Sequence, residues 1–276
     1  MGTENEDEQE PQFWSPQVPN DDTPAWRYLD FTQLISLLER ESLWFNRADL
    51  FEDPLEGSLS RANVETRELR YEDTEIPQSA LETMSQAARQ HRKTTYLNCW
   101  HLNNYESAAM WEQYSTNGQG IAIQTNVGNL IDSLTDKPGV FKSGEDTPDD
   151  SDEIDRIITF GRVQYIDYDR HLIPENNLYA PLFHKRLSFK HEQEFRAAFS
   201  KHFEIMREDD EADFIDGSDD VPAGVYVDVN LEKLIDTLYI SPTSPEWFSE
   251  QVELIKERYD IECDTQKSSL DEDPVF

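Results

Sequence analysis

Basic residues are scarce in this chain. Lys and Arg total 24 against 58 Asp and Glu, which gives a formal net charge of −34. A nucleic-acid-binding surface needs a basic patch, so this balance argues against direct nucleic-acid binding. Like charges at this density destabilise the compact state, whereas salt at about 1 M shortens the Debye length to about 3 Å. The composition therefore predicts an acidic surface with halophilic adaptation, which requires high salt for stability.

Cysteine and long hydrophobic runs are also rare. The two cysteines, Cys99 and Cys263, fall in apolar, strand-like runs, which predicts buried thiols and not a disulfide framework. No run reaches the roughly 18 apolar residues of a membrane span. The first residues are acidic and proline-rich, unlike the basic start and apolar stretch of a signal peptide. We therefore expect a cytoplasmic protein without a membrane partner.

Familiar catalytic and metal-binding signatures are missing. The sequence contains no G-x-G-x-x-G, P-loop, H-E-x-x-H, G-x-S-x-G or paired C-x-x-C motif, and no complete calcium-binding loop. His184 and His191 are the closest histidine pair and have Glu192 and Glu194 nearby, but their spacing is unlike that of known ligand pairs. No metal site is predicted.

Aromatic residues are plentiful, with 14 Phe, 11 Tyr and 6 Trp, which is typical of a chain that folds. Predicted strands and helices alternate without a βαβ rhythm, which favours an α+β fold with a single mixed or antiparallel sheet and flanking helices. Two acidic loop insertions are expected, at 136–153 and 204–221. We expect a disordered acidic tail over 1–24, one domain over 25–270 and a C-terminal tail over 271–276.

Hydrophobic periodicity and capping residues place the elements. Strands are expected at 26–29, 42–46, 95–102, 119–125, 157–168, 194–199, 225–229, 238–241 and 261–264. Helices are expected after Asp30, over 60–93 with a break at Pro77, and at 103–114, 127–134, 176–187 and 245–259. Asp30 with Gln33 fits a capping box, and Asn103 with Glu106 fits another.

The segment Phe51-Glu52-Asp53-Pro54-Leu55-Glu56-Gly57 is unusual for plain surface. Acidic residues on both sides of a proline, inside an apolar turn, would project two carboxylates from a rigid bend. An equally good interpretation is a tight turn that Asp53 caps.

A predicted short helix carries Trp111 and Tyr114 on one side together with Ser107. Trp111 at that spacing is expected in the core. Tyr114 is the better site candidate, because its hydroxyl needs a partner if it is buried. The following Gly118 and Gly120 are interpreted as a simple turn, with close approach of a ligand as the alternative.

The segment 185–196 concentrates basic groups in an acidic chain. It predicts either a buried ion-pair network or an anionic ligand. With a strand starting at Glu192, the two-residue period would place Glu192, Glu194 and Arg196 on one face and Phe195 on the core face. A Glu194–Arg196 pair that only stabilises the strand edge is the structural alternative.

In these segments the sequence resembles the prokaryotic domain of unknown function 2971 family. The matching motifs are Trp26-Arg27-Tyr28, Phe51-Glu52-Asp53-Pro54-Leu55-Glu56, Met110-Trp111-Glu112-Gln113-Tyr114 with Gly120, and Lys185 through Phe189 to Glu192-x-Glu194-x-Arg196. The resemblance runs from residue 26 to about residue 270. One departure is Glu52, which stands where the family usually has Asn.

The resemblance implies a distant relation to mono-ADP-ribosyltransferase-type folds and a defence or mobile-element setting. It implies NAD as a substrate, with Arg27 and Tyr28 binding the nucleotide and Tyr114 contacting the nicotinamide end. Glu194, with Glu192 beside it, would bind the ribose and stabilise the charge that develops as nicotinamide leaves. Asp53, Lys185 and Arg196 complete the candidate binding residues.

Two alternatives remain open. The first is a non-catalytic module that binds an anionic small molecule or nucleotide through Lys185, Arg186, Lys190 and Arg196. The second is a metal-assisted nuclease that uses Asp53, Glu56, Glu192 and Glu194. All three hypotheses require Tyr28, Asp53, Tyr114, Glu194 and Arg196 to meet in one cleft.

Overall fold

The computed structural model describes residues 14–71, 78–115, 118–148, 153–201, 221–272, 274 and 276. Several predictions lie outside these residues: the tail up to residue 13, the helix break at Pro77 and the acidic loop at 204–220. Trp14, within the predicted tail, contacts the fold, because its ring lies 6.3 Å from that of Phe183 and 5.3 Å from that of His184.

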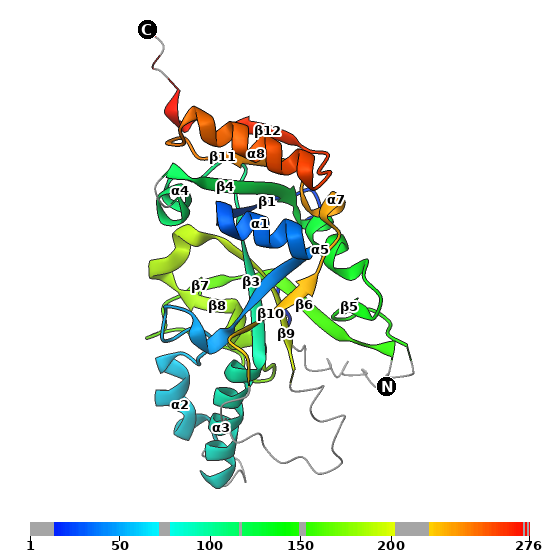
Figure 1. The fold of residues 1–276 in the computed structure, drawn as a ribbon. Helices are drawn as coiled ribbons and strands as arrows, with labels where there is room; N and C mark the ends of the chain where they lie inside the picture. The colour runs from blue at the N-terminus through cyan, green and yellow to red at the C-terminus, as the bar shows by residue number, and fades with distance from the viewer. Residues whose placement is uncertain are drawn as a thin grey trace, which may run out of the picture.

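A sheet of mostly antiparallel strands forms the centre of the molecule, as the α+β prediction requires (Figure 1). Its strands are β1 (Pro24–Asp30), β2 (Ser42–Arg47), β3 (Thr95–Leu102), β4 (Gly120–Asn126), β5 (Val140–Lys142), β6 (Arg156–Arg162), β9 (Glu194–Ser200), β10 (Gly224–Asp228), β11 (Thr237–Ile240) and β12 (Asp264–Lys267). Their order is β12-β11-β4-β1-β3-β9-β6-β5, while β2 pairs with both β3 and β10. A separate parallel pair joins β7 (Gln164–Ile166) and β8 (His184–Arg186).

Helices flank the sheet. They are α1 (Phe31–Arg40), α2 (Arg61–Tyr71), α3 (Gln78–Thr94), α4 (Ala108–Tyr114), α5 (Val127–Thr135), α7 (Leu231–Leu234) and α8 (Glu246–Arg258), with 3-10 turns η1 (Ala48–Leu50), η4 (Ala180–Phe183), η5 (Leu187–Glu192) and η6 (Ser269–Asp271). The predicted capping box of α1 is confirmed, since Asp30 accepts from the backbone N–H of Gln33 and Gln33 bonds back to Asp30.

Three local predictions were wrong. The helix expected at 176–187 is only η4 followed by β8. The side chain of Asn177 accepts a hydrogen bond from the N–H of Tyr179 and forms a turn there, and β8 pairs with β7. The cap of α4 is Ser107, whose side chain accepts from the N–H of Met110, and not Asn103. The strand expected at 261–264 begins only at Asp264, so Cys263 precedes β12. Cys99 and Cys263 are free thiols that pack, partly buried, against hydrophobic clusters.

The predicted acidic loop at 136–153 contains a strand. β5 pairs in parallel with β6, and the carbonyl of Gly139 accepts from the N–H of Asp155 at 2.8 Å. Val140 is buried in the main core. Val140 therefore anchors this segment to the core.

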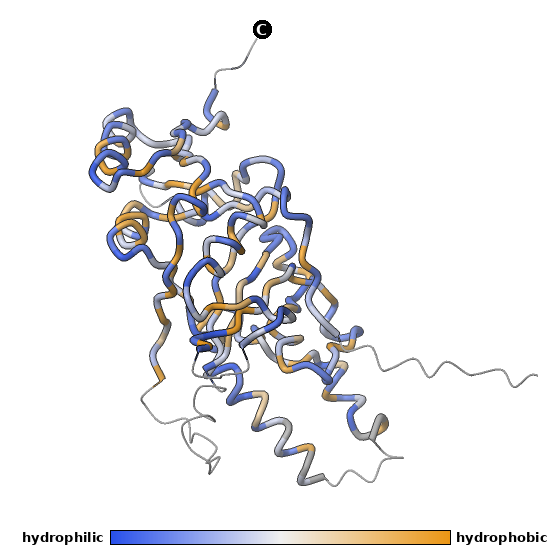
Figure 2. The backbone as a smooth tube through the Cα atoms, turned by 90° about the vertical axis from the view of Figure 1, so that its right-hand side faces the viewer, coloured by the Kyte–Doolittle hydropathy of each residue, from blue (hydrophilic) through white to orange (hydrophobic). Residues whose placement is uncertain are grey.

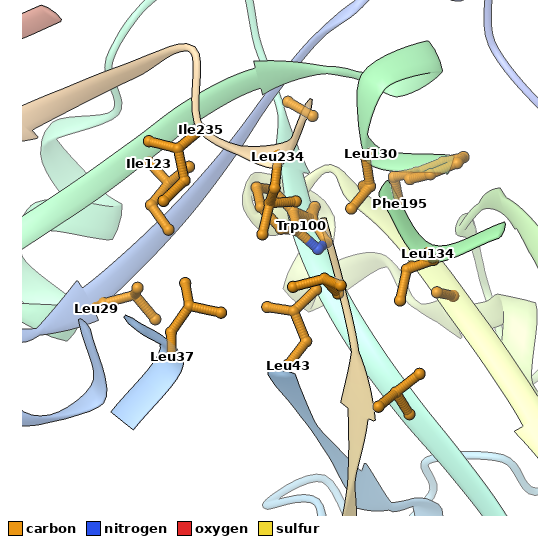
Figure 3. Close-up of a cluster of buried hydrophobic side chains, with 14 of the residues drawn as sticks. Leu29, Leu37, Leu43, Trp100, Ile123, Leu130, Leu134, Phe195, Leu234 and Ile235 are labelled. Carbon is orange, nitrogen blue, oxygen red and sulfur yellow. The ribbon is translucent and has the colours of Figure 1, made fainter. Parts of the chain in front are cut away.

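Alternation along the strands separates the main core from the opposite face of the sheet. Trp100 on β3 and Phe195 on β9 point into the core, where α1 contributes Leu37 and α5 contributes Leu130 and Leu134 (Figure 3). The indole N–H of Trp100 donates to the side chain of Asn98 at 2.7 Å, which satisfies its buried polar atom.

Hydrophobic stretches along the chain are short and are interrupted by hydrophilic residues (Figure 2). Among the described helices, none combines the length and the apolar character needed to cross a membrane.

The sheet divides at β3. One edge of β3 pairs with β9 along its length, from Thr95 to His101. The other edge pairs with β1 only at His101 and Leu102, and with β2 only at Tyr96 and Leu97. The two partner strands diverge between these points (Figure 1). A wedge therefore opens beside residues 98–100, and the candidate site lies there.

Core packing predicts a clear difference between two leucines. Leu130 is fully buried in α5, whereas the side chain of Leu254 in α8 is 55% exposed. Leu130→Ala should lower the free energy of unfolding by about 2–5 kcal/mol. Leu254→Ala should change it by no more than about 0.5 kcal/mol. Denaturant titration in molar potassium chloride measures both values, and equal effects would contradict this core.

Candidate functional site

A cavity of about 480 Å³ occupies the wedge between β1, β2 and β3. Its walls contain most of the residues predicted from the sequence, namely Arg27, Tyr28, Asp53, Tyr114, Lys185, Glu192 and Glu194. Arg196 lies behind this wall, fully buried, and contacts Glu194. The residues expected to meet in one cleft therefore lie together.

Strand register explains how β3 and β9 form the floor of the cavity. Cys99 is paired with Arg196, and His101 is paired with Glu194. These four side chains share the face opposite Trp100 and Phe195. The predicted common face of Glu194 and Arg196 is thus confirmed.

Glu192 reaches the cavity by a different route from the predicted one. The strand β9 begins at Glu194, and Gln193 before it has a φ of 40°. That left-handed residue ends η5 and separates Glu192 from the strand. Glu192 therefore approaches Glu194 from a turn rather than from the next position on the same strand face.

Lys185, on β8, lies among three carboxylates. Its Nζ is 2.7 Å from Oε1 of Glu194 and 3.5 Å from Oε2 of Glu56, and it also donates to Glu192. Burial lowers the pKa of Lys185, but Glu194 and Glu56 outweigh this effect and raise it. The ammonium group stays charged and occupies the point between the three carboxylates.

Arg196, behind the cavity wall, is the second cation of the network. Its guanidinium lies 2.7 Å from Glu194 and 2.6 Å from Glu56, and it donates to the carbonyl of Leu182 at 2.5 Å. Burial alone would raise the pKa of Glu194, but Arg196 and Lys185 hold it well below its ordinary value. Glu194 is therefore ionised at neutral pH.

Glu192 has the opposite character. Burial and the adjacent negative Glu194 raise the pKa of Glu192 to about 8, although Lys185 acts in the lowering direction. Two cations thus balance three carboxylates, and the least buried acid keeps a proton at neutral pH. The cavity wall carries two neighbouring glutamates in different protonation states, as in sites built for acid–base chemistry.

The turn at 51–57 uses the two carboxylates that flank Pro54, Asp53 and Glu56, for structure. Asp53 pairs with Arg186 through two contacts of 2.6 and 3.1 Å and accepts from the N–H of Leu55 at 3.0 Å. Glu56 is 1% exposed and belongs to the network around Lys185 and Arg196. The capped-turn interpretation therefore describes the geometry, and Asp53 still forms part of the cavity wall.

Arg27 differs from the other cations of the cavity. Its Nη1 donates to the carbonyl of Cys99 at 2.7 Å, and its guanidinium lies 5.9 Å from the centre of the Trp100 ring. In the part of the chain that the structure describes, no carboxylate pairs with it. Burial lowers its pKa by disfavouring the charge. An anionic ligand would supply the missing counter-charge.

His101 was not singled out from the sequence. It is 2% exposed, and its Nδ1 lies 2.7 Å from the carbonyl oxygen of Glu192. Burial lowers the pKa of His101, so the ring is neutral, with Nδ1–H as the donor. Its Nε2 is buried without a hydrogen-bond partner among the described residues. The only sequence signal was its place two residues after Cys99 on one strand face.

Aromatic side chains form the opposite wall. The hydroxyl of Tyr28 accepts from the N–H of Ser107 at 2.8 Å, and its ring meets that of Trp111 edge-on at 4.9 Å. Trp111 is buried, as predicted. The ring of Tyr114 is 38% exposed at the rim of the cavity, and burial of its hydroxyl raises its pKa.

The ion pairs of Lys185 and Arg196 bear on the two alternative hypotheses, the metal-assisted nuclease and the anion-binding module. Lys185 fills the position that a metal ion would take between Glu56, Glu192 and Glu194. Across the described ranges, no group of three or more His, Cys, Asp or Glu could hold a metal ion. Lys185, Arg186 and Arg196 are each paired with carboxylates, so these cations are not free to bind an anion.

Residues 110–197 match the model of a family described as "Protein of unknown function (DUF2971)". The family resemblance is confirmed over these residues. The DUF2971 match runs from α4 into β9 and includes Tyr114, Lys185, Glu192, Glu194 and Arg196. No curated protein and no solved structure matches the chain.

Removal of the central ammonium group should destabilise the protein. Lys185→Met leaves three buried carboxylates with Arg196 as their remaining cation, so the free energy of unfolding should fall by about 3–5 kcal/mol. Lys190→Met is the matched control, because Lys190 is exposed on the neighbouring turn. Denaturant titration compares the two variants, and equal stability would show that the network contributes nothing measurable.

The two glutamates should titrate differently. With labelled glutamate carboxyl groups, NMR should show Glu192 titrating near pH 8, with its signal assigned by its loss in Glu192→Gln. Glu194→Gln removes the neighbouring negative charge, so the pKa of Glu192 should fall by about one unit or more. An ordinary glutamate pKa for Glu192 in both proteins would contradict the coupled pair.

Proposed function

We propose that the cavity is the active site of an enzyme that cleaves the glycosidic bond between nicotinamide and ribose in NAD. The ADP-ribosyl group would pass to water or to an acceptor on a protein. The observation that carries this proposal is the pair formed by ionised Glu194 and protonated Glu192 in one cavity with the uncompensated Arg27.

Glu194 is suited to stabilise the transition state. As the bond between C1′ and the nicotinamide nitrogen breaks, its electron pair leaves with nicotinamide and positive charge develops on the ribose. A carboxylate that is already fixed and ionised stabilises that charge without reorganisation. Arg196 and Lys185 provide the fixing, through their contacts of 2.7 Å with the two oxygens of Glu194.

Glu192 is suited to accept the proton that the attacking hydroxyl group releases. The attacking hydroxyl group forms the new bond to C1′ and must release one proton. A carboxyl group with a pKa of about 8 exchanges protons near neutral pH, and its ionised form can accept this one. The rate should therefore rise with pH until Glu192 is ionised.

Other residues of the cavity would position the substrate. Arg27 would bind the phosphates, and the neutral Nε2 of His101 would accept a hydrogen bond from a ribose hydroxyl or from the carboxamide of nicotinamide. Tyr114, at the rim, would cover the nicotinamide end. Asp53 and Tyr28 support the walls through Arg186 and Ser107.

A non-catalytic nucleotide-binding module is the second candidate. It is favoured by the ion pairs of Lys185 with Glu56, Glu192 and Glu194, since such pairs also make a rigid wall for binding. In that case NAD would raise the melting temperature without any release of nicotinamide.

The cellular setting belongs to the same proposal. The net charge of −34 fits a salt-rich cytoplasm, and the family resemblance implies a defence or mobile-element role. Assays are therefore best carried out in multimolar potassium chloride.

The proposal predicts that nicotinamide release from NAD depends on Glu194. Glu194→Gln keeps the size of the side chain and removes its charge, so the rate should fall by at least about 100-fold. Glu112→Gln, an exposed change on α4, should keep the full rate. Glu192→Gln should remove the rise in rate toward pH 8.

Chromatographic measurement of nicotinamide gives these rates, and the melting temperature of each variant shows whether it folds. A folded Glu194→Gln protein with the wild-type rate would sink the mechanism. Absence of release from the wild-type protein, with NAD raising its melting temperature, would leave the binding module instead.

A further inference from the structure

A second cavity, of about 290 Å³, adjoins the first. The two cavities share Arg27, Leu29, Gln33 and Trp44 in their walls. The second cavity extends from there between α1 and the strand pair of β2 and β10, and ends at Tyr226. Arg27 therefore lies at the junction of two connected compartments.

Two exposed aromatic rings form the far wall. Trp44 on β2 is directly opposite Tyr226 on β10, and their rings meet at 4.8 Å in an edge-on arrangement. They are 40% and 41% exposed. Gly224 makes room for the indole, because a Cβ at that position would lie 2.2 Å from Cζ2 of Trp44.

The pair is also fixed from the side of α1. The hydroxyl of Tyr226 is 3.3 Å from Oγ of Ser36, and the guanidinium of Arg40 lies 4.5 Å from the centre of the Tyr226 ring. Rings that are held in place and still expose two fifths of their surface offer a ready stacking surface for a planar ligand.

Polar groups in this cavity can select such a ligand. Oε1 of Gln33 accepts from the N–H of Asp30, so its Nε2 hydrogens remain for a ring nitrogen. Leu29, Leu37 and Leu43 supply the apolar part of the wall. An aromatic base with hydrogen-bonding atoms on its edge fits this combination.

We infer that the second cavity binds the adenine base of an ADP group, with Arg27 at the junction binding the diphosphate. This inference rests on the proposed function, and it orients the substrate. The nicotinamide ribose would lie in the first cavity beside Glu194, and adenine would stack on Trp44 and Tyr226. The enzyme would then require a dinucleotide, and a nicotinamide mononucleotide would occupy only one compartment.

Calorimetric titration with ADP tests the base site without any reaction. ADP should bind the wild-type protein, and Trp44→Ala should weaken binding by about 5- to 140-fold, which is the usual range for loss of one stacked base. Trp44→Phe should recover part of the loss. Trp247→Ala is the matched control, because Trp247 on α8 is 52% exposed and lies outside both cavities.

Kinetic measurements separate this inference from the proposed reaction. Trp44→Ala should raise the KM for NAD, whereas Trp247→Ala, outside both cavities, should leave it unchanged. If ADP binding shows the expected losses and NAD is not cleaved, the base site stands and the proposed reaction fails. If wild-type protein does not bind ADP, or if Trp44→Ala and Trp247→Ala bind it equally, the base site is overturned even when NAD is cleaved.

Discussion

A buried ion-pair network holds the site together. Lys185 and Arg196 join the turn at 51–57, the end of η5 and the start of β9 through their contacts with Glu56, Glu192 and Glu194. Burying such charges costs much of what their attraction returns, and apolar replacements often match the stability of buried ion pairs. The network is therefore poorly explained by stability alone, whereas it fixes one ionised and one protonated carboxyl group side by side.

The divergence of β1 and β2 beside β3 opens the cavity through which this network is reached. In a continuous sheet, the carbonyl of Cys99 would pair with a neighbouring strand, and the face of β3 would be covered. Here β1 and β2 diverge, and Arg27 takes that carbonyl instead. The Arg27 side chain thus satisfies the unpaired carbonyl at this edge and places a positive charge between the two cavities. The divergence of β1 and β2 therefore creates both the space and the position of this charge.

Sequence periodicity was enough to predict what depends on one segment. Alternation placed Glu194 and Arg196 on one face, and the capping box at Asp30 located the start of α1. Features that depend on register between distant strands were missed, such as His101 opposite Glu194 and Trp44 opposite Tyr226. The short β8 was mistaken for a helix because its pairing partner, β7, lies in a different segment, and local propensity carries no trace of that pairing.

Binding of an anionic dinucleotide, as proposed, would require this acidic protein to overcome the repulsion of its own negative charge. Repulsion from a net charge of −34 acts over distance, and salt at about 1 M confines it to about 3 Å. Direct contacts between the protein and a ligand are shorter than or close to this distance, so salt screens them little. In the cavity wall, the charges of Glu56 and Glu194 are already neutralised by Lys185 and Arg196. Stacking on Trp44 does not depend on charge. In such a medium, base stacking would supply most of the affinity, and Arg27 would set the position of the diphosphate.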